Sequence, residues 1–443
     1  MTQKKLEVMV PEEATERGPI LKGELRSLEI RVSDILAQFA RIVPRSKKAK
    51  IYFYPTLEQA KMLFGSPSPF AFEGTWCPRE GVEEHWRSNE IWMNSGSSIG
   101  YDEMNYLTYC SGRLVDLHIK ATSDGKPKQD ELPSAWFVMN RCFLLQILAT
   151  HDEEEIEAGK KYGMDGPIYK FALSGDAMAE IRRHTVSQSF GVMKEVKKSG
   201  YSIVVHGFKD LDTLERDVEC LLILASLASR ERSSSWHWSA DEAPGLHSRY
   251  WRFGIPKWPK RPDGVEPLLL RDHTHCSNFL SCALKTYLNS NSNEFLDAAV
   301  YALFSRDLVL EVQIVRLFSG VQSALLFAGS KGKGNKRPRI EPLYKNFVQR
   351  RHAKFDDLWP LFRQGRNSGP SLYDIRNFIA HGGVFAERDW MALSYAAENL
   401  QWILERILLI ALGWDIALSN VSPKKLSLYH AYNWKEQQQR LKL

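Results

Sequence analysis

The chain has 443 residues, of which 44% are hydrophobic, 25% are charged and 11% are aromatic. This composition excludes a globally disordered protein, and the length is enough to bury the cores of two or three domains. The net charge is only +6, yet residues 291–443 hold 21 Lys and Arg against 14 Asp and Glu, which favours a polyanionic partner or a solvated basic surface in that third.

The sequence lacks the features of an exported or membrane protein. Its first residues contain no apolar stretch of the secretory type, and no apolar run has the expected length of a membrane span. The six cysteines are scattered without a CxxC pair, as in proteins that keep their thiols reduced. We therefore expect a cytoplasmic protein with no membrane contact.

Residues 1–290 have a mixed pattern. Runs of aromatic and β-branched residues predict strands at 50–54, 90–93 and 201–206. Apolar residues at helical spacing predict a helix over 210–229, with an aspartate as its N-cap. The stretch 230–267 is rich in Ser, Trp, Pro and His, and we expect an irregular loop there.

From residue 292 onward, apolar residues recur at helical spacing with short interruptions, which favours a helical bundle. The predicted helices span 293–304, 307–328, 341–363, 371–382 and 388–413, followed by a polar helical tail from about 424. Gly382 and Gly383 are expected to end the fourth helix. The chain is therefore predicted to be an α+β protein, with a mixed α/β module over 1–290 and an all-α bundle over 291–443.

A basic loop separates the second and third predicted helices. It departs from a phosphate-binding loop because Asn335 stands before the lysine and no Ser or Thr follows it. Five positive charges in nine residues remain, and they suit contact with an RNA backbone: Lys331, Lys333, Lys336, Arg337 and Arg339. A solvated loop between helices explains them equally well.

The sequence offers little support for a metal site. His273, His275, Cys276 and Cys282 are close in sequence, but their spacing fits no common structural zinc site. Motifs of the familiar serine hydrolases and zinc proteases are missing too. We therefore expect no metal and no cofactor.

The residues Arg376, Asn377 and His381 form the motif with the clearest chemical meaning. On a helix, Asn377 and His381 share a face and Arg376 flanks the same groove. A histidine that exchanges protons, beside an arginine that holds a phosphate, can cleave RNA by attack of its own 2′-hydroxyl without a metal. The structural alternative is a His that hydrogen-bonds at a helix end and an Arg that caps a neighbouring helix, and the bare spacing occurs elsewhere in the chain.

The sequence Asp-Ile-Arg-Asn-Phe-Ile-Ala-His-Gly-Gly, within a five-helix segment, resembles the HEPN superfamily and is close to the form found in ApeA-like anti-phage proteins. The segments 308–327 and 390–413 resemble the first and last helices of that bundle. The resemblance implies that Arg376 and His381 are ribonuclease residues, with Asn377 as their polar companion. It further implies a homo-oligomer with a shared active site, and abortive infection as the role. The substrate would be RNA, with tRNA as one candidate, and a phage-derived molecule is one candidate for the trigger.

Two residues depart from the family pattern. Gln322 stands where the first helix often carries Glu, and Gly383 stands where a subgroup of HEPN toxins carries Tyr. The main alternative is a non-catalytic HEPN-fold module that dimerises and binds nucleic acid. A nuclease regulated by a small nucleotide has less support, because no glycine fingerprint of the Rossmann type is present. We expect a metal-independent endoribonuclease in which residues 1–290 sense or regulate.

Overall fold

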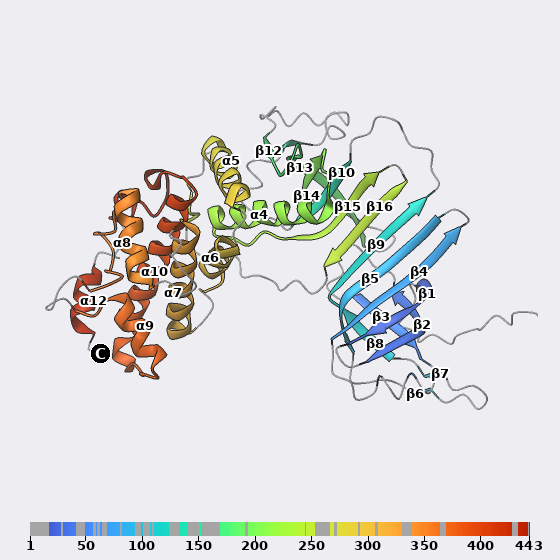
Figure 1. The fold of residues 1–443 in the computed structure, drawn as a ribbon, viewed down its shortest axis with the longest axis horizontal. Helices are drawn as coiled ribbons and strands as arrows, with labels where there is room; N and C mark the ends of the chain where they lie inside the picture. Colours follow the sequence, from blue (N-terminus) through green and yellow to red (C-terminus); the bar gives the residue numbers. More distant parts are fainter. Residues whose placement is uncertain are drawn as a thin grey trace, which may run out of the picture. The chain divides into compact units, whose positions relative to one another are not determined.

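The computed structural model describes residues 17–27, 30–40, 49–55, 59, 63, 69–79, 82–93, 99–100, 107–108, 110–123, 133–139, 150–151, 169–190, 194–243, 245–252, 266–269, 273–290, 293–305, 309–329, 339–363, 369–427, 433–441 and 443. The chain forms an α+β protein, with a large antiparallel sheet in its N-terminal region and helices in its C-terminal region (Figure 1).

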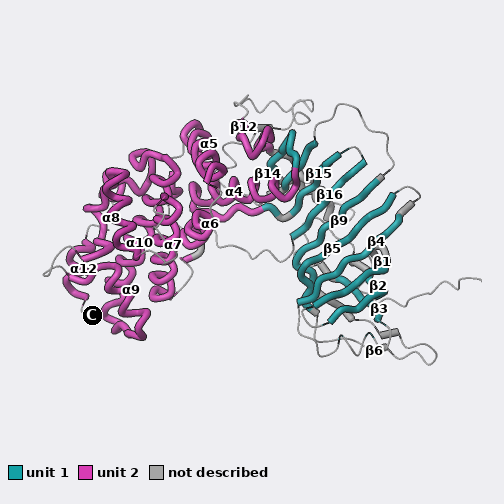
Figure 2. Tube along the Cα trace, in the orientation of Figure 1, with its two compact units in different colours: residues 1–139, 202–209, 235–257 teal, residues 140–201, 210–234, 258–443 magenta. Residues whose placement is uncertain are grey.

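The chain divides into two compact units (Figure 2). Unit 1 comprises residues 1–139, 202–209 and 235–257, and unit 2 comprises residues 140–201, 210–234 and 258–443. The boundary expected after residue 290 falls inside unit 2, between α5 (His273–Ser290) and α6 (Asn293–Phe304). The helical unit therefore includes segments that the sequence pattern grouped with the N-terminal region.

Unit 1 is an antiparallel sheet with one closed part. Its strands are β1 (Arg17–Arg26), β2 (Arg31–Ala40), β3 (Ala49–Tyr54), β4 (Phe70–Arg79), β5 (Val82–Met93), β8 (Cys110–Leu114), β9 (Asp116–Ser123), β10 (Ser134–Met139), β15 (Ser235–Ala243) and β16 (Leu246–Arg252), with a separate short pair β6 (Ile99–Gly100) and β7 (Leu107–Thr108). They hydrogen-bond in the order β10-β15-β16-β9-β5-β4-β1-β2-β3-β8. β8 also pairs with the end of β5. The six strands β5, β4, β1, β2, β3 and β8 therefore form a closed ring.

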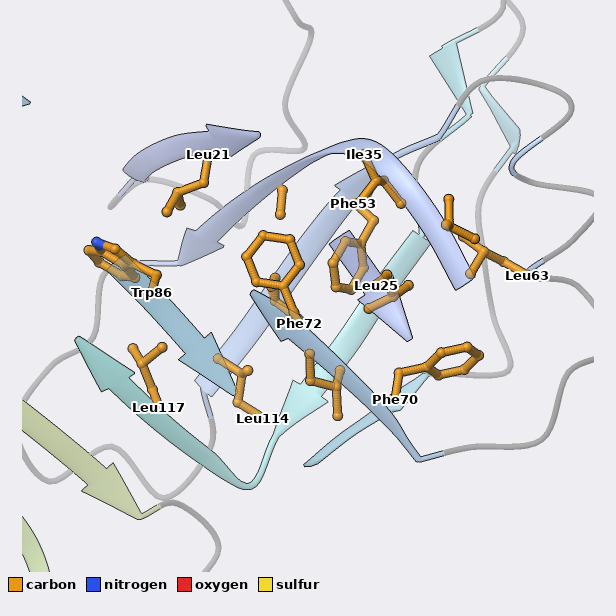
Figure 3. Packing of buried hydrophobic residues seen from close by; sticks show 14 of the residues in the cluster. Leu21, Leu25, Ile35, Phe53, Leu63, Phe70, Phe72, Trp86, Leu114 and Leu117 are labelled. Carbon is orange, nitrogen blue, oxygen red and sulfur yellow. The ribbon is translucent and has the colours of Figure 1, made fainter. Parts of the chain in front are cut away.

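The interior of this ring is a packed apolar core (Figure 3). Its buried side chains include Leu21, Leu25, Ile35, Phe53, Leu63, Phe70, Phe72, Trp86, Leu114 and Leu117. The ring centroids of Phe53 and Phe72 lie 5.8 Å apart. Gly23 and Gly74 pair across β1 and β4, and a Cβ at either position would come within 2.7 Å of the Phe72 ring. These two glycines therefore make room for the phenylalanine.

One carboxylate marks the place where β5 changes partner from β9 to β8. Residues 82–87 of β5 pair with β9, whereas residues 91–93 pair with β8. Between them, the Asp116 carboxylate accepts hydrogen bonds from the Asn89 backbone N–H at 2.8 Å and the Ser88 hydroxyl at 3.0 Å. It thereby satisfies polar groups that the strand exchange removes from the ladder.

Unit 2 contains the helices named in Figure 1 and a small group of strands. The helices are α4 (Leu211–Ser229), α5, α6, α7 (Leu310–Phe327), α8 (Ile340–Arg351), α9 (Leu372–Ala380), α10 (Trp390–Ala411), α11 (Pro423–Leu426) and α12 (Trp434–Arg440), with the 3-10 turns η2 (Glu387–Asp389) and η3 (Ile416–Leu418). The strands are β11 (Thr150–His151), β12 (Lys170–Ala172), β13 (Met178–Phe190) and β14 (Lys194–His206), the last of which ends in unit 1. β11 runs parallel and β12 antiparallel to β13.

The central helix of unit 2 is α10, against which α6, α7 and α12 pack. Its apolar face is fully used inside the chain, since each of these residues is at most 6% exposed: Leu400, Ile403, Leu404, Ile407, Leu408 and Ala411. These six side chains therefore belong to the core and are not available to an interface. Any second copy of the chain must contact another surface.

Among the described residues, one helix is long and apolar enough to cross a membrane by length and composition alone. This helix is α7, with a mean hydropathy of 1.3. It packs against α6, α9 and α10, as the core helix of a helical bundle does. The length and composition of α7 are therefore weak evidence that it spans a membrane.

Several predicted elements are confirmed. The strands expected at 50–54, 90–93 and 201–206 lie within β3, β5 and β14, and the helix expected over 210–229 is α4. The Asp210 carboxylate caps α4 by accepting a hydrogen bond from the Thr213 backbone N–H at 2.8 Å.

The irregular loop predicted for 230–267 is wrong for its first half, which contains the hairpin of β15 and β16. Aromatic side chains face each other across this hairpin: Trp238 stacks on Tyr250 with centroids 5.7 Å apart, and His237 stacks on Trp251 at 4.8 Å. These cross-strand pairs stabilise the hairpin, although the composition of the segment is typical of a loop. Residues 253–265 lie outside the described residues.

The helix predicted over 341–363 is also partly wrong, because α8 ends at Arg351. His352 has a φ of 48° and caps the helix in the left-handed conformation. The non-helical residues 353–363 that follow are fixed by tertiary contacts. The buried Asn399 side chain accepts a hydrogen bond from the Trp359 backbone N–H at 3.0 Å, and Asp357 forms a bidentate pair with Arg406. We call residues 352–363 the strap.

Candidate functional site

The Arg-Asn-x3-His motif lies on α9, whose first turn is firmly anchored. The Ser371 hydroxyl accepts from the Asp374 backbone N–H, and the Asp374 carboxylate accepts from the Ser371 backbone N–H at 2.9 Å, which makes a capping box. Asp374 also pairs with Arg363 of the strap at 3.0 Å. Since Leu372 and Ile375 are buried, the start of α9 is fixed on the bundle and its end carries the motif outward.

The end of α9 confirms the role predicted for the two glycines. His381 follows the last helical residue, and Gly382 adopts a φ of +82° that a residue with a side chain rarely takes. The Gly383 N–H then donates to the Phe378 carbonyl at 2.9 Å, while the Gly382 N–H donates to Ile379, as in a Schellman motif. A Cβ on Gly383 would come within 2.5 Å of the Phe378 ring, so this turn requires glycine at both positions.

Arg376 is half-buried and held by two neighbours. Its Nη1 donates a hydrogen bond to the Asn377 Oδ1 at 3.0 Å. Its Cζ lies 5.9 Å from the ring centroid of Phe318 on α7, within the range of a cation–π contact. Phe318 in turn packs against Tyr373 of α9, with centroids 5.7 Å apart. These contacts hold the guanidinium beside α7.

His381 has a different environment, because it is exposed at the end of the same helix. Among the described residues, no side chain hydrogen-bonds to its imidazole. The structure therefore joins Arg376 to Asn377 directly and places His381 one helical turn after Asn377, free to meet solvent or a ligand. Gln322 lies on α7 one turn after Phe318, so a neutral amide occupies this position.

The predicted basic loop can be placed only at its end. Lys331, Lys333, Lys336 and Arg337 lie outside the described residues. Arg339 is exposed and is the N-cap residue of α8. Whether this loop contacts RNA stays a prediction.

The four potential metal ligands at 273–282 all lie on α5 but have different surroundings. The His273 Nδ1 lies 2.5 Å from the Tyr169 hydroxyl. Cys276 is buried, whereas Cys282 is exposed and its thiol faces the Leu412 carbonyl at 3.6 Å. In the part of the chain that the structure describes, no group of three or more His, Cys, Asp or Glu side chains is arranged to hold a metal ion.

Sequence reasoning missed two buried ion pairs that organise the helices around the site. Arg406 of α10 is fully buried and pairs with Asp357 of the strap at 2.5 Å. Its neighbour Glu405 is 1% exposed and accepts from Arg230 Nε, just after α4, at 2.9 Å. The signal in the sequence was the Glu-Arg pair within an otherwise apolar run of α10, because charges in such a position require partners.

Sequence reasoning also missed three exposed apolar side chains that follow the motif. Val384, Trp390 and Met391 are 86%, 67% and 60% exposed. Large apolar side chains exposed close together mark surfaces that contact other molecules. We call these three residues the apolar rim.

No family model, no curated protein and no solved structure matches the chain. The fold and the site thus define an α+β protein whose helical unit presents an Arg-Asn-x3-His motif on a capped helix.

Proposed function

We propose that the chain is a metal-independent endoribonuclease of the HEPN type, which acts in the cytoplasm in anti-phage defence with Arg376, Asn377 and His381 as its catalytic residues. The observation that carries the proposal is the fixed guanidinium of Arg376, one and a half helical turns before an exposed histidine. A guanidinium held in place can bind a phosphate without further ordering, and an exposed imidazole is accessible for proton transfer.

In the proposed reaction, the 2′-hydroxyl of RNA attacks the adjacent phosphorus and the 5′-oxygen of the next nucleotide leaves. An imidazole takes the proton of the 2′-hydroxyl, and an imidazolium gives a proton to the leaving oxygen. Arg376 stabilises the negative charge that develops on the phosphoryl oxygens, while Asn377 keeps the guanidinium in position. The products are a 2′,3′-cyclic phosphate and a 5′-hydroxyl.

The acid and base steps each need an imidazole, and each chain offers one in the motif. The proposal therefore includes a homo-oligomer in which two copies of α9 share one active site. Because the apolar face of α10 is core, we propose that the second copy contacts the apolar rim beside the motif. We further propose that RNA, with tRNA as one candidate, is the substrate, and that unit 1 responds to a phage-derived trigger.

The test is cleavage of total RNA in EDTA by the wild-type chain and by His381→Ala. We expect the wild type to leave 2′,3′-cyclic phosphate ends and the variant to lose roughly 10²-fold or more in rate with an unchanged melting temperature. His352→Asn is the matched control, since His352 is also an exposed histidine at a helix end, and asparagine tolerates its positive φ.

A requirement for Mg²⁺, or equal activity of His381→Ala and wild type, would contradict the proposal. Binding of RNA without any cleavage would favour the alternative, a non-catalytic module of the HEPN fold that dimerises and holds nucleic acid. The observation that favours this alternative is the absence of a described contact between the side chains of Arg376 and His381.

A further inference from the structure

A cluster of unpaired positive charge lies at the C-terminal end of α8. Arg350 and Arg351 occupy the last turn of the helix, and Lys354 follows in the strap. All three side chains are exposed, and no carboxylate of the described residues lies within 4.0 Å of them. We call these three residues the α8 basic end.

Neighbouring lysine and arginine side chains of the same unit have acidic partners, whereas the α8 basic end has none among the described residues. Lys345 pairs with Glu341 at 2.7 Å, and Arg363 pairs with Asp374 at 3.0 Å. The two aspartates that follow in the strap do not neutralise the α8 basic end. Asp357 is committed to the buried Arg406, so Asp356 is the one nearby carboxylate in sequence against three cations.

The exposed charge lies at the end of α8 and not along its solvent-facing side. Leu343 and Phe347 are buried against the bundle, whereas the exposed residues Lys345, Gln349 and His352 recur at helical spacing on the opposite side. The helix is about 18 Å long, from its 12 residues at 1.5 Å each. Arg350 and Arg351 lie within about 80° of Leu343 around the helix axis, so they are exposed because the helix ends there and not because they share this outer face.

The α8 basic end belongs to the same packed region as the motif. Tyr344 in the middle of α8 contacts Phe362 of the strap, with centroids 5.6 Å apart. Phe362 contacts Tyr373 of α9 at 5.4 Å, and Tyr373 lies one turn before Arg376. A strand of RNA bound at the α8 basic end would thus lie on the helical unit that carries the motif.

We propose that the α8 basic end is a sequence-independent phosphate-binding surface for single-stranded RNA. The choice of RNA rests on the proposed function, whereas the choice of a polyanion rests on the unpaired charge. Arginine guanidinium groups bind phosphate oxygens through paired hydrogen bonds, and such contacts carry no base preference. Arg350 and Arg351 also face the partial negative charge of the helix end, but Lys354 lies beyond the helix and does not have that role.

The experiment measures binding of a labelled single-stranded RNA to the full chain carrying His381→Ala, so that the RNA is not consumed. In this background, the triple variant Arg350→Gln, Arg351→Gln, Lys354→Gln should lower the slope of log affinity against log salt by about 2. The affinity at 0.1 M salt should fall on the order of tenfold to a hundredfold. Lys354→Gln alone should lower the slope by about 0.7.

The matched control replaces three exposed basic side chains of the same unit by Gln. They are far apart in sequence: Lys285, Arg316 and Lys424. The control should keep the affinity, slope and melting temperature of the parent. A triple variant with the parent's affinity and slope overturns the proposal. So does a triple variant whose only change is a lower melting temperature, or one that loses binding to phosphatidylserine vesicles but not to RNA.

Failure of this surface and failure of the proposed function give different results. If the wild-type chain cleaves RNA but the α8 variants bind it normally, the surface is rejected and the ribonuclease proposal stands. If RNA binding depends on the α8 basic end but the wild-type chain does not cleave RNA, the surface stands and the ribonuclease proposal is rejected.

Discussion

At the scale of single residues, Arg376 shows how far a local motif predicts its own site. The contact with Asn377 connects neighbours in sequence, so the motif already suggested it. The contact with Phe318 comes from α7 and depends on how two helices pack. A cation–π contact of this kind contributes about 0.5 to 1 kcal/mol at a partly exposed site. Phe318 is therefore expected to act through Arg376 as a positioning residue.

Phe318→Leu tests this role because leucine keeps an apolar side chain but removes the ring beneath the guanidinium. We expect RNA cleavage to slow by about 2- to 5-fold, which is the rate equivalent of the lost contact. Phe362→Leu is the control, since it removes a buried ring that contacts Tyr373 but not Arg376. Melting temperatures should fall similarly in both variants. Equal effects of the two on cleavage would show that Phe318 only fills space.

Two histidines of unit 1 make its stability sensitive to acid. Burial lowers the pKa of His118 and that of His237 from the ordinary value of 6.5, because the charged imidazole loses contact with water. The unfolded chain therefore binds more protons than the folded chain once the pH falls below about 6.5. It follows that unit 1 is most stable above this pH and loses stability as the pH falls through it.

His118→Phe should reduce this sensitivity to acid. His118 packs edge-on against Trp238 and Tyr250, and its Nε2 is buried without a hydrogen-bond partner among the described residues. Phenylalanine keeps the aromatic packing and removes the titrating group. The drop in melting temperature between pH 7 and pH 5 should become smaller than in the wild type. An unchanged drop in the His118 variant would contradict the assignment.

At the scale of elements, periodicity predicted α4, α6, α7 and α9 well because their buried faces follow helical spacing. The strap and the β15–β16 hairpin were not predictable in the same way. The strap is held by Asn399 and Arg406 of α10, which are remote in sequence, and the hairpin by aromatic pairs across two strands. Contacts between distant residues decide these segments, and local spacing does not contain that information.

Asp357→Asn tests how much the strap depends on its ion pair. Arg406 is fully buried, so the change leaves a buried guanidinium without its counter-charge. Breaking a buried pair from one side costs about 3 to 5 kcal/mol, and we expect a loss of this size in chemical unfolding. Asp356→Asn, at the exposed neighbour, should cost little. A loss below about 1 kcal/mol would show that solvent reaches Arg406 in the folded chain.

At the scale of the whole molecule, the two units are interleaved along the chain. Residues 210–234 belong to unit 2, although the segments on both sides, 202–209 and 235–257, belong to unit 1. The sequence pattern predicted the two classes of structure but placed one boundary after residue 290, because α4 and α5 follow strands and resembled part of a mixed region. The Arg230–Glu405 pair and the packing of α4 on α5 and α6 are what assign this segment to the helical unit.

The shared active site of the proposed function makes a prediction that only an oligomer can satisfy. Arg376→Ala and His381→Ala should each be nearly inactive as purified homo-oligomers. When the two variants are mixed and allowed to exchange, each mixed dimer keeps one arginine for the phosphate and one imidazole for one of the two proton transfers, so cleavage should recover in part and rise above that of either variant alone. Trp390→Lys should prevent this recovery, because a charge within the apolar rim opposes burial against a second copy. Sedimentation of the same samples should show dimers for the mixture and monomers for the Trp390 variant. Full activity of a monomeric wild-type chain would instead place a complete site within one copy, and the apolar rim would then need a different partner.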